Sequence, residues 1–125
     1  MFTYKTKIDN SEIHGTGVFA IEFIPKDTII WRFQENFDIK ITQAEFDKLP
    51  TLAQEHFNFY GYFNTKEGGW VLCTDNAKYT NHSLNPNMKM IDEINSIATQ
   101  DIQIGEEITE NYFVFDEKAN EKNIK

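Results

Sequence analysis

The sequence is poor in the residues that cross-link or interrupt a chain. Its 125 residues include one cysteine, three prolines and six glycines. The single cysteine, Cys73, excludes an intramolecular disulfide and a zinc cluster built on several thiolates. One thiol fits a reducing compartment, so we expect a cytoplasmic protein, or a nuclear or host-nuclear one where the source is a eukaryote, a virus or an intracellular bacterium.

Long apolar runs and basic residues are also scarce. No stretch of about 18 apolar residues occurs, and the N-terminus has no apolar segment of signal-peptide length, so the sequence predicts no membrane span and no secretion. Twelve Lys and Arg stand against twenty Asp and Glu, which gives a formal net charge of -8. This balance argues against direct nucleic-acid binding, because phosphate contacts depend on clustered Lys and Arg. The negative charge either maintains solubility or attracts a basic partner.

Aromatic residues, by contrast, are plentiful. They make up 14% of the chain, with eleven phenylalanines and five tyrosines. A chain of this length can bury roughly two-thirds of its unfolded surface in a single domain. We therefore expect one compact domain, residues 1–115, followed by a polar tail, residues 116–125, that is frayed at its end.

Residue patterns favour a mainly β (α+β) fold with one helical insert, residues 42–63. Within it, Thr42 to Glu45 has capping-box form, and two short helices are expected on either side of Pro50, with Thr51 as a possible cap of the second. A hairpin loop is expected over 64–69 because of its paired glycines. Short apolar and β-branched runs predict strands over 2–8, 18–23, 28–33, 59–63, 70–74, 88–91, 96–99 and 108–115.

Three separated patterns are the candidates for chemistry. The first, His14 to Ala20 (HGTGVFA), has two glycines around one residue just before an expected strand, where a backbone can approach a ligand closely. The second, Lys78 to Asn87 (KYTNHSLNPN), is a polar loop, and the third is Gly105 to Tyr112 (GEEITENY). Alone, the glycine pattern is more simply a tight turn, since a dinucleotide fingerprint needs a third glycine and a following helix.

Together and in this order, the three patterns resemble the signatures of the SET-domain protein lysine methyltransferases, in a minimal form without zinc clusters before or after the core. The resemblance implies a SET fold of short β-sheets with a knot-like crossing of two segments. The loop TNHSLNPN would then be buried in that crossing, where short amide and hydroxyl side chains satisfy backbone groups that no sheet can pair.

The resemblance also implies methyl transfer from S-adenosylmethionine to the ε-amine of a lysine in a protein. That reaction needs a neutral amine, and lysine has a pKa near 10.4 in water. Desolvation beside a cationic sulfonium lowers this pKa, because both effects penalise the ammonium. An acidic protein with such a channel would attract a basic, lysine-containing protein or peptide.

The matching positions define the expected site. Tyr112 takes the place of the catalytic tyrosine, and we expect it to orient the amine, because phenolate is scarce at neutral pH; taken alone, it would be read as a core tyrosine. The resemblance assigns cofactor binding to Gly15, Thr16, Gly17, Asn81, His82 and Tyr112. For the walls of the lysine channel we expect Tyr60, Tyr62, Tyr79, Phe113 and Phe115.

Other features limit or qualify the assignment. The three histidines and Cys73 show no paired ligand spacing, so no metal site is expected. Glu106 and Glu107 are expected to stabilise a turn, because neighbouring strand residues point to opposite faces.

Leu84 stands where the family often has cysteine, and no cysteine cluster follows Tyr112 to close the channel. A second subunit could close it, so a homodimer is possible. The alternatives are a catalytically inactive SET-like module that binds a basic protein and an acidic structural protein without a small-molecule site.

Overall fold

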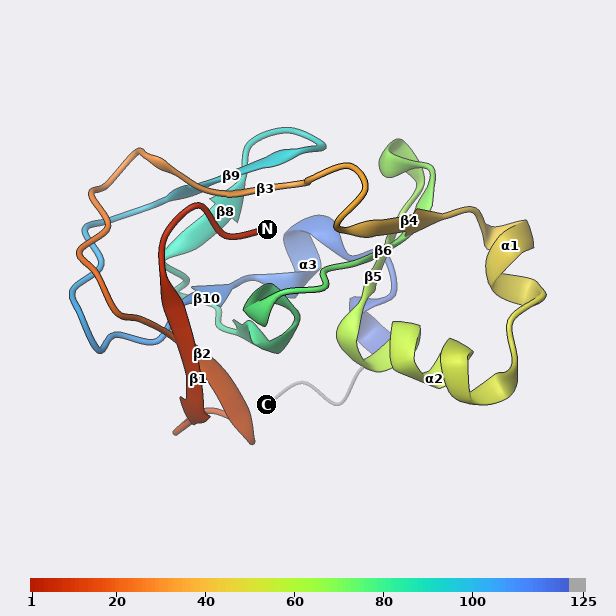
Figure 1. Ribbon diagram of the computed structural model, residues 1–125, viewed down its shortest axis with the longest axis horizontal. Helices are drawn as coiled ribbons and strands as arrows, with labels where there is room; N and C mark the ends of the chain where they lie inside the picture. Colours follow the sequence, from red (N-terminus) through yellow and green to blue (C-terminus); the bar gives the residue numbers. More distant parts are fainter. Residues whose placement is uncertain (122–125) are drawn as a thin grey trace.

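The computed structural model describes residues 1–121, which form three small sheets and a few short helices (Figure 1). The sheets have the strand orders β1-β2, β3-β9-β8-β10-β7 and β4-β6-β5. The first two-stranded sheet lies at one end of the molecule, and helices α1 and α2 lie at the other (Figure 1). The strands are β1 (Thr6–Asn10), β2 (Thr16–Ala20), β3 (Ile29–Arg32), β4 (Ile39–Ile41), β5 (Tyr62–Asn64), β6 (Gly69–Leu72), β7 (Asn81–His82), β8 (Met88–Met90), β9 (Asn95–Ala98) and β10 (Thr109–Glu110). The helices are α1 (Gln43–Asp47), α2 (Thr51–Tyr60) and α3 (Tyr112–Phe115), with 3-10 turns η1 (Thr65–Glu67), η2 (Asn76–Tyr79) and η3 (Ala119–Glu121).

Strand β10 lies between β7 and β8 and runs parallel to both. Thr109 and Glu110 pair with the two residues of β7, and Glu110 also pairs with Met88 of β8. Since β7 and β8 are consecutive in the sequence, the connection over residues 83–87 has to cross β10 to reach its other side. This is the knot-like crossing that the resemblance to the SET family implied.

The start of α1 confirms the predicted capping box. The Thr42 hydroxyl accepts a hydrogen bond from the Glu45 amide at 3.1 Å, and the Glu45 carboxylate accepts one from the Thr42 amide at 2.9 Å. The expected cap of α2 is wrong. Thr51 is already helical, and Pro50 is the N-cap, with its carbonyl accepting from the amide of Ala53 at 3.0 Å. The first helical bond therefore starts one residue earlier than a Thr51 cap would require.

Two expected strands contain helix instead. The expected strand over 59–63 begins only at Tyr62, because α2 continues through Tyr60. The expected strand over 108–115 is limited to β10, and the chain then turns into α3. The Asn111 side chain accepts from the Phe113 amide at 3.0 Å and so caps this helix. A capping side chain offers the backbone an alternative to the strand ladder, which alternating hydrophobicity does not reveal.

The segment after α3 is folded against the hairpin β5–β6. The Asp116 carboxylate accepts from the Phe63 amide at 3.1 Å, and the Glu117 amide donates to the Phe63 carbonyl at 2.8 Å. Asp116 is 4% exposed and Ala119 2%. The expectation of a frayed tail is therefore wrong for residues 116–121, because buried polar and apolar anchors hold them. Its remaining part, residues 122–125, lies outside the described residues.

Two apolar clusters stabilise the sheets. The larger one joins β2 and the five-stranded sheet around Val18, Ile30 and Ile108, all of which are fully buried. The smaller one fills the space between the helical insert and β6, where the Phe46 ring stacks on Trp70 with centroids 4.3 Å apart. Of the helices in residues 1–121, none is long and apolar enough to span a bilayer.

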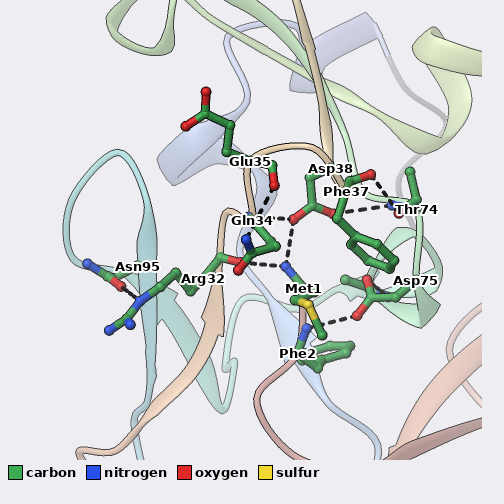
Figure 2. A network of polar contacts seen from close by, with 11 residues as sticks. Met1, Phe2, Arg32, Gln34, Glu35, Phe37, Asp38, Thr74, Asp75 and Asn95 are labelled. Atoms are coloured by element: carbon green, nitrogen blue, oxygen red, sulfur yellow. Dashed lines mark hydrogen bonds and ion pairs between the residues drawn. The ribbon is translucent and has the colours of Figure 1, made fainter.

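A buried carboxylate, that of Asp38, links the N-terminus to the segments that contain Gln34 and Thr74 (Figure 2). The Asp38 side chain is fully buried and accepts from the Met1 α-amine at 2.7 Å, the Gln34 amide at 2.9 Å and the Thr74 amide at 3.3 Å. These donors come from the chain start, from the segment after β3 and from the end of β6. Because a buried carboxylate needs several donors to offset its lost hydration, this cluster fixes three segments at one point.

Candidate active site

Two adjoining cavities meet at Tyr112. The larger is a cleft of about 540 Å³, and the smaller, which we call the narrow cavity, has a volume of about 50 Å³. The cleft is lined by Ile13, His14, Gly15, Thr16, Glu55, Asn58, Phe59, Tyr60, Lys78, Tyr79, Thr80, Asn81, His82, Tyr112 and Glu121. The residues common to both cavities are Phe59, Tyr60, Lys78, Thr80 and Tyr112.

Asn81 in β7 connects the floor of the cleft to the glycine loop. Its side-chain amide donates to the carbonyls of His14 at 3.0 Å and Thr16 at 3.3 Å, and to the Glu107 carboxylate at 2.9 Å. Gly15 lies at the cleft with φ at +46°, and a Cβ there would meet nothing within 4 Å. The amide group of Asn81 thus holds the loop in place, while the backbone of the loop is open to a ligand.

Glu107 packs behind the same loop. Its carboxylate accepts from the Ser11 hydroxyl at 2.8 Å as well as from Asn81. A Cβ on Gly17 would lie 2.4 Å from the Glu107 Oε2 atom, so this position has no room for a side chain. Glu106 accepts from the Gln103 amide at 2.9 Å within the preceding turn. Both glutamates therefore have the structural roles that the sequence indicated.

His82 fixes the start of α3 from the neighbouring strand. Its Nδ1 atom accepts a hydrogen bond from the Tyr112 amide at 3.1 Å, which requires that nitrogen to be unprotonated. Burial lowers the pKa of His82 below its usual value, so the neutral form that accepts this bond is favoured. The ring also packs against the rings of Tyr112 and Phe113, with centroids 5.3 and 5.2 Å away.

The Tyr112 hydroxyl is held at the junction of the two cavities. It donates a hydrogen bond to the Thr80 carbonyl, so its proton is already engaged. Burial, together with the charges of Glu110, Asp116 and Glu107, raises the pKa of Tyr112 above its usual value. The hydroxyl therefore stays protonated at neutral pH and does not serve as a base. Because a phenol oxygen also has acceptor lone pairs, it can accept a hydrogen bond from a group in the narrow cavity.

Aromatic side chains form one wall of the narrow cavity. Tyr62 and Phe115 pack edge to face with centroids 5.0 Å apart, and Phe115 lies 5.9 Å from the Tyr112 ring. The Asn64 side chain donates to the Phe115 carbonyl at 2.9 Å and so ties this wall to the hairpin. Phe115 of the C-terminal segment thus forms part of this wall, as expected, where the chain has no cysteine cluster after Tyr112.

The opposite wall is formed by the five-stranded sheet and is partly polar. Ser96 is 1% exposed, Glu110 9% and Trp31 4%. The indole Nε1 of Trp31 has no hydrogen-bond partner among the described residues. Cys73 also lies here, and burial raises the pKa of its thiol, so it stays protonated and unreactive.

Most of the expected site residues lie at these cavities. Gly15, Thr16, Asn81, His82 and Tyr112 line the cleft, Tyr60 lines both cavities, and Tyr62 and Phe115 line the narrow one.

Three residues lie elsewhere. Gly17 lies behind the cleft against Glu107, and Tyr79 lines the cleft instead of the expected channel. Phe113 lines neither cavity and is 52% exposed. It was expected at the channel because no cysteine cluster follows Tyr112 to close it, whereas the helical turn of α3 places it beside His82.

Several residues at the cavities did not stand out in the sequence. Lys78 lies within the second motif, and its ammonium lies over the rings of Tyr60 and Tyr79, 5.7 and 5.4 Å from their centroids. Glu110 lies within the third motif between two other polar residues, Thr109 and Asn111, so the sequence held no separate signal for it. The others are core or helix residues whose types carry no chemical signature: Trp31, Phe59, Cys73, Met88, Met90 and Ser96.

The comparison with protein families agrees with this geometry. The family model described as the SET domain matches residues 15–113. The chain belongs to the SET-domain family. A comparison with curated proteins found no match.

Solved structures with a SET domain have a similar fold. The Neurospora SET-domain protein DIM-5, a histone lysine methyltransferase, superposes with a TM-score of 0.61 at 21% identity over 89% of this chain. The chain spans about half the length of that protein, 53%. A putative histone methyltransferase from Plasmodium falciparum gives 0.61 at 24% identity, covering 88% of this chain and 94% of its own. A humanized mutant of the Chaetomium thermophilum Polycomb Repressive Complex 2 gives 0.62 at 24%, covering 87% and 15%.

Within residues 1–121, no three His, Cys, Asp or Glu side chains gather closely enough to hold a metal ion. The cleft and the narrow cavity therefore offer backbone groups, hydroxyls, aromatic walls and a few charges. These groups can bind and orient ligands and exclude water.

Proposed function

We propose that this SET domain transfers a methyl group from S-adenosylmethionine to the ε-amine of lysine in a protein. The observation that carries the proposal is the meeting of two cavities at one partly buried tyrosine, Tyr112. One cavity is wide enough for a cofactor, and the other admits a thin side chain. Neither the wide cavity nor the narrow cavity, taken alone, distinguishes an enzyme from a binding module.

The residues of the cleft fit S-adenosylmethionine. A volume of about 540 Å³ lies within the range of small-molecule sites, roughly 300–1,000 Å³. The backbone at Gly15 and Thr16 would approach the ligand closely, Asn81 would fix that loop, and His82 would line the floor. Lys78 offers a positive charge for a carboxylate, and the acidic residues Glu55 and Glu121 offer charge for cationic or hydroxyl groups.

The chain's own residues would prepare the amine. Bound S-adenosylmethionine would supply the methyl group, which would pass to the lysine nitrogen as the carbon–sulfur bond breaks with its electron pair staying on sulfur, after the ammonium proton has left to solvent. Aromatic walls exclude water from the narrow cavity, which favours the neutral amine. The Tyr112 oxygen would accept an amine N–H and aim the nitrogen lone pair at the methyl group.

We further propose a basic protein segment as the substrate. The chain carries a formal net charge of -8, and attraction between opposite charges raises the rate of encounter. The aliphatic stem of lysine suits apolar walls, because it buries methylene groups while its end remains polar. A second subunit is not needed to supply Phe115. The homodimer is therefore a separate proposal, which measurements of the protein's mass in solution would test.

The test combines binding with turnover. Calorimetric titration with S-adenosylhomocysteine should show binding to the wild type and to Tyr112→Phe. Mass spectrometry of a peptide library, with a central lysine between basic residues, should show methyl transfer by the wild type and a large loss in Tyr112→Phe. Binding without transfer to any peptide or lysate protein would overturn the proposal in favour of an inactive module. Absence of binding would overturn both.

A further inference from the structure

Thr80 receives the proton of Tyr112, and it lies at a joint in the backbone. It follows the 3-10 turn η2 and comes directly before β7. It lines both cavities and is 8% exposed. Because its carbonyl accepts the hydrogen bond of the Tyr112 hydroxyl, the direction of this carbonyl determines where the phenol proton points.

The side chain of Thr80 folds back onto η2. Its hydroxyl donates to the Ala77 carbonyl at 2.8 Å, and its amide donates to the same carbonyl at 3.1 Å. The other end of the turn is held by the Asp75 carboxylate, which accepts from the Ala77 amide at 3.2 Å and from the Phe2 amide at 2.8 Å (Figure 2). After Thr80 the backbone enters β7, which pairs with β10. The Thr80 carbonyl is therefore held from both directions along the chain, and the Thr80 hydroxyl is one of its anchors.

A phenol beside a neutral amine has two possible hydrogen bonds. Burial raises the pKa of Tyr112, so the phenol keeps its proton at neutral pH. A neutral amine nitrogen is a good acceptor, and a phenol with an unengaged proton donates to it. That bond occupies the lone pair that has to attack the methyl group. When the Thr80 carbonyl holds the proton, the phenol oxygen offers its lone pairs, and the amine becomes the donor.

We propose that the Thr80 hydroxyl is a positioning group that keeps the Thr80 carbonyl aimed at Tyr112 and so leaves the amine lone pair free for methyl transfer. This inference rests on the proposed function. No atom passes through Thr80, which acts only through the Tyr112 hydroxyl. An apolar side chain of the same shape would leave the amide as the remaining bond of this residue to Ala77, and the carbonyl would be held less firmly.

Thr28 has the same local arrangement away from the site. Its hydroxyl donates to the Pro25 carbonyl, three residues earlier, at 2.7 Å, and its amide donates to that carbonyl at 3.4 Å. Its own carbonyl accepts from the Ala98 amide at 3.0 Å, and it lines neither cavity. Comparing the two threonines therefore separates an effect on the reaction from the general effect of removing a hydroxyl from a turn.

The kinetic experiment compares wild type, Thr80→Val, Thr80→Ser and Thr28→Val on one basic lysine peptide that the wild type methylates. Thr80→Val keeps the branched shape and should lower kcat by about threefold to tenfold, the effect of one hydrogen bond. It should not raise KM for the peptide, because the amine still binds, with its lone pair on the phenol proton. Thr80→Ser should recover most of the rate, and Thr28→Val should keep the wild-type value.

Two further measurements connect the effect to Tyr112. In the Tyr112→Phe background, Thr80→Val should cause no additional loss of kcat, because the hydroxyl on which it acts is absent. Nuclear magnetic resonance of isotope-labelled tyrosine Cζ atoms tests the same contact without turnover. The signal that disappears in Tyr112→Phe belongs to Tyr112, and Thr80→Val should shift it. Thr80→Ser and Thr28→Val should leave that signal near its wild-type position.

Circular dichroism in the far ultraviolet establishes that each variant is folded. An unshifted Tyr112 signal or an unchanged kcat in folded Thr80→Val overturns the inference. An equal loss of kcat in Thr28→Val, or an effect confined to KM, also overturns it, because either result indicates a structural role alone. A shifted signal in Thr80→Val, with no methyl transfer by any of the proteins, supports the positioning of Tyr112 by Thr80 and counts against the proposed function alone.

Discussion

The side chain of Asn87 holds the backbone of Thr109 across the crossing. Its Oδ1 atom accepts from the Thr109 amide at 2.8 Å, and its Nδ2 atom donates to the Glu107 carbonyl at 2.8 Å. Asn87 is 5% exposed, so water does not replace either bond. One amide side chain thus supplies both partners for a segment that lies between two strands and has no full ladder of its own.

Removing this side chain should destabilise the fold. Asn87→Ala leaves the buried Thr109 amide and the partly buried Glu107 carbonyl without these partners, and we expect it to lower the free energy of unfolding by about 2–6 kcal/mol, at about 1–3 kcal/mol for each group. Asn85→Ala, two residues earlier and exposed, is the control and should change it by less than about 0.5 kcal/mol. Urea unfolding followed by tryptophan fluorescence measures both. Equal stability of the two variants would mean that the crossing does not depend on Asn87.

A side chain at Gly17 should be destabilising, for a reason that differs from the usual one. Its constraint is the Glu107 carboxylate, 2.4 Å from the place of a Cβ, and not a left-handed backbone. Gly17→Ala should displace Glu107, weaken its bonds to Ser11 and Asn81, and loosen the loop at the cleft. We expect a loss of about 1–3 kcal/mol in stability and weaker binding of S-adenosylhomocysteine.

Gly15→Ala provides the comparison for that variant. A Cβ at Gly15 meets nothing within 4 Å, but φ is +46°, so the cost comes from the backbone alone, about 1–2 kcal/mol. The two variants are separated by adding Glu107→Gln to each. The loss caused by Gly17→Ala should overlap with the loss caused by Glu107→Gln, because the added Cβ meets that side chain, whereas the loss at Gly15, whose Cβ meets nothing within 4 Å, should be additive. Additive losses at both glycines would contradict the role given to Glu107.

The sequence was informative where a motif has a fixed chemical reason. The resemblance to the SET family implied a buried crossing at the NHS loop, and the fold has that crossing with Asn81 and Asn87 as buried bonding groups, although Leu84 and Asn85 between them are exposed. The capping box at Thr42 was a local signal and was correct. Its basis is the hydrogen-bonding capacity of short polar side chains next to a defined backbone feature, which needs no knowledge of distant residues.

The remaining parts depend on contacts between distant segments. Ile108 to Phe115 alternates like one strand, yet α3 begins at Tyr112, where the backbone amide donates to His82, thirty residues earlier. Asp116 and Ala119 look like a polar tail, and only their packing on the hairpin buries them. The positions of Phe113 and Tyr79 relative to the two cavities follow from these contacts. Propensity and alternation do not contain that information.

The hydrogen-bonded cluster around Asp38, which lines neither cavity, should contribute strongly to the stability of the fold. Asp38→Ala leaves the Gln34 and Thr74 amides without their acceptor and removes the ion pair of the Met1 amine, which keeps its bond to the Arg32 carbonyl. We expect a loss of about 2–4 kcal/mol, below the 3–5 kcal/mol typical of a broken buried pair because the Met1 side of this pair is partly exposed. Thermal unfolding by calorimetry measures the change. Exposed Glu35, close by in sequence, gives the control Glu35→Gln, which should leave the midpoint unchanged; an equal drop in both variants would refute the role of the buried cluster.

Acid should weaken the fold through His82. Above the usual value of 6.5 the imidazole is neutral in both folded and unfolded chains and adds no pH dependence. Burial lowers the pKa in the folded state, so below pH 6.5 the unfolded chain takes up the proton first, and the free energy of unfolding decreases as pH falls. The decrease stops growing once the pH is below the folded pKa. Protonation of Nδ1 there also removes the acceptor of the Tyr112 amide.

Urea unfolding between pH 5 and 8 should therefore show a smaller loss of stability for His82→Asn, whose side-chain oxygen does not titrate, than for the wild type. His56→Asn, at an exposed position, should follow the wild-type curve, and parallel curves for all three proteins would mean that His82 does not carry the effect.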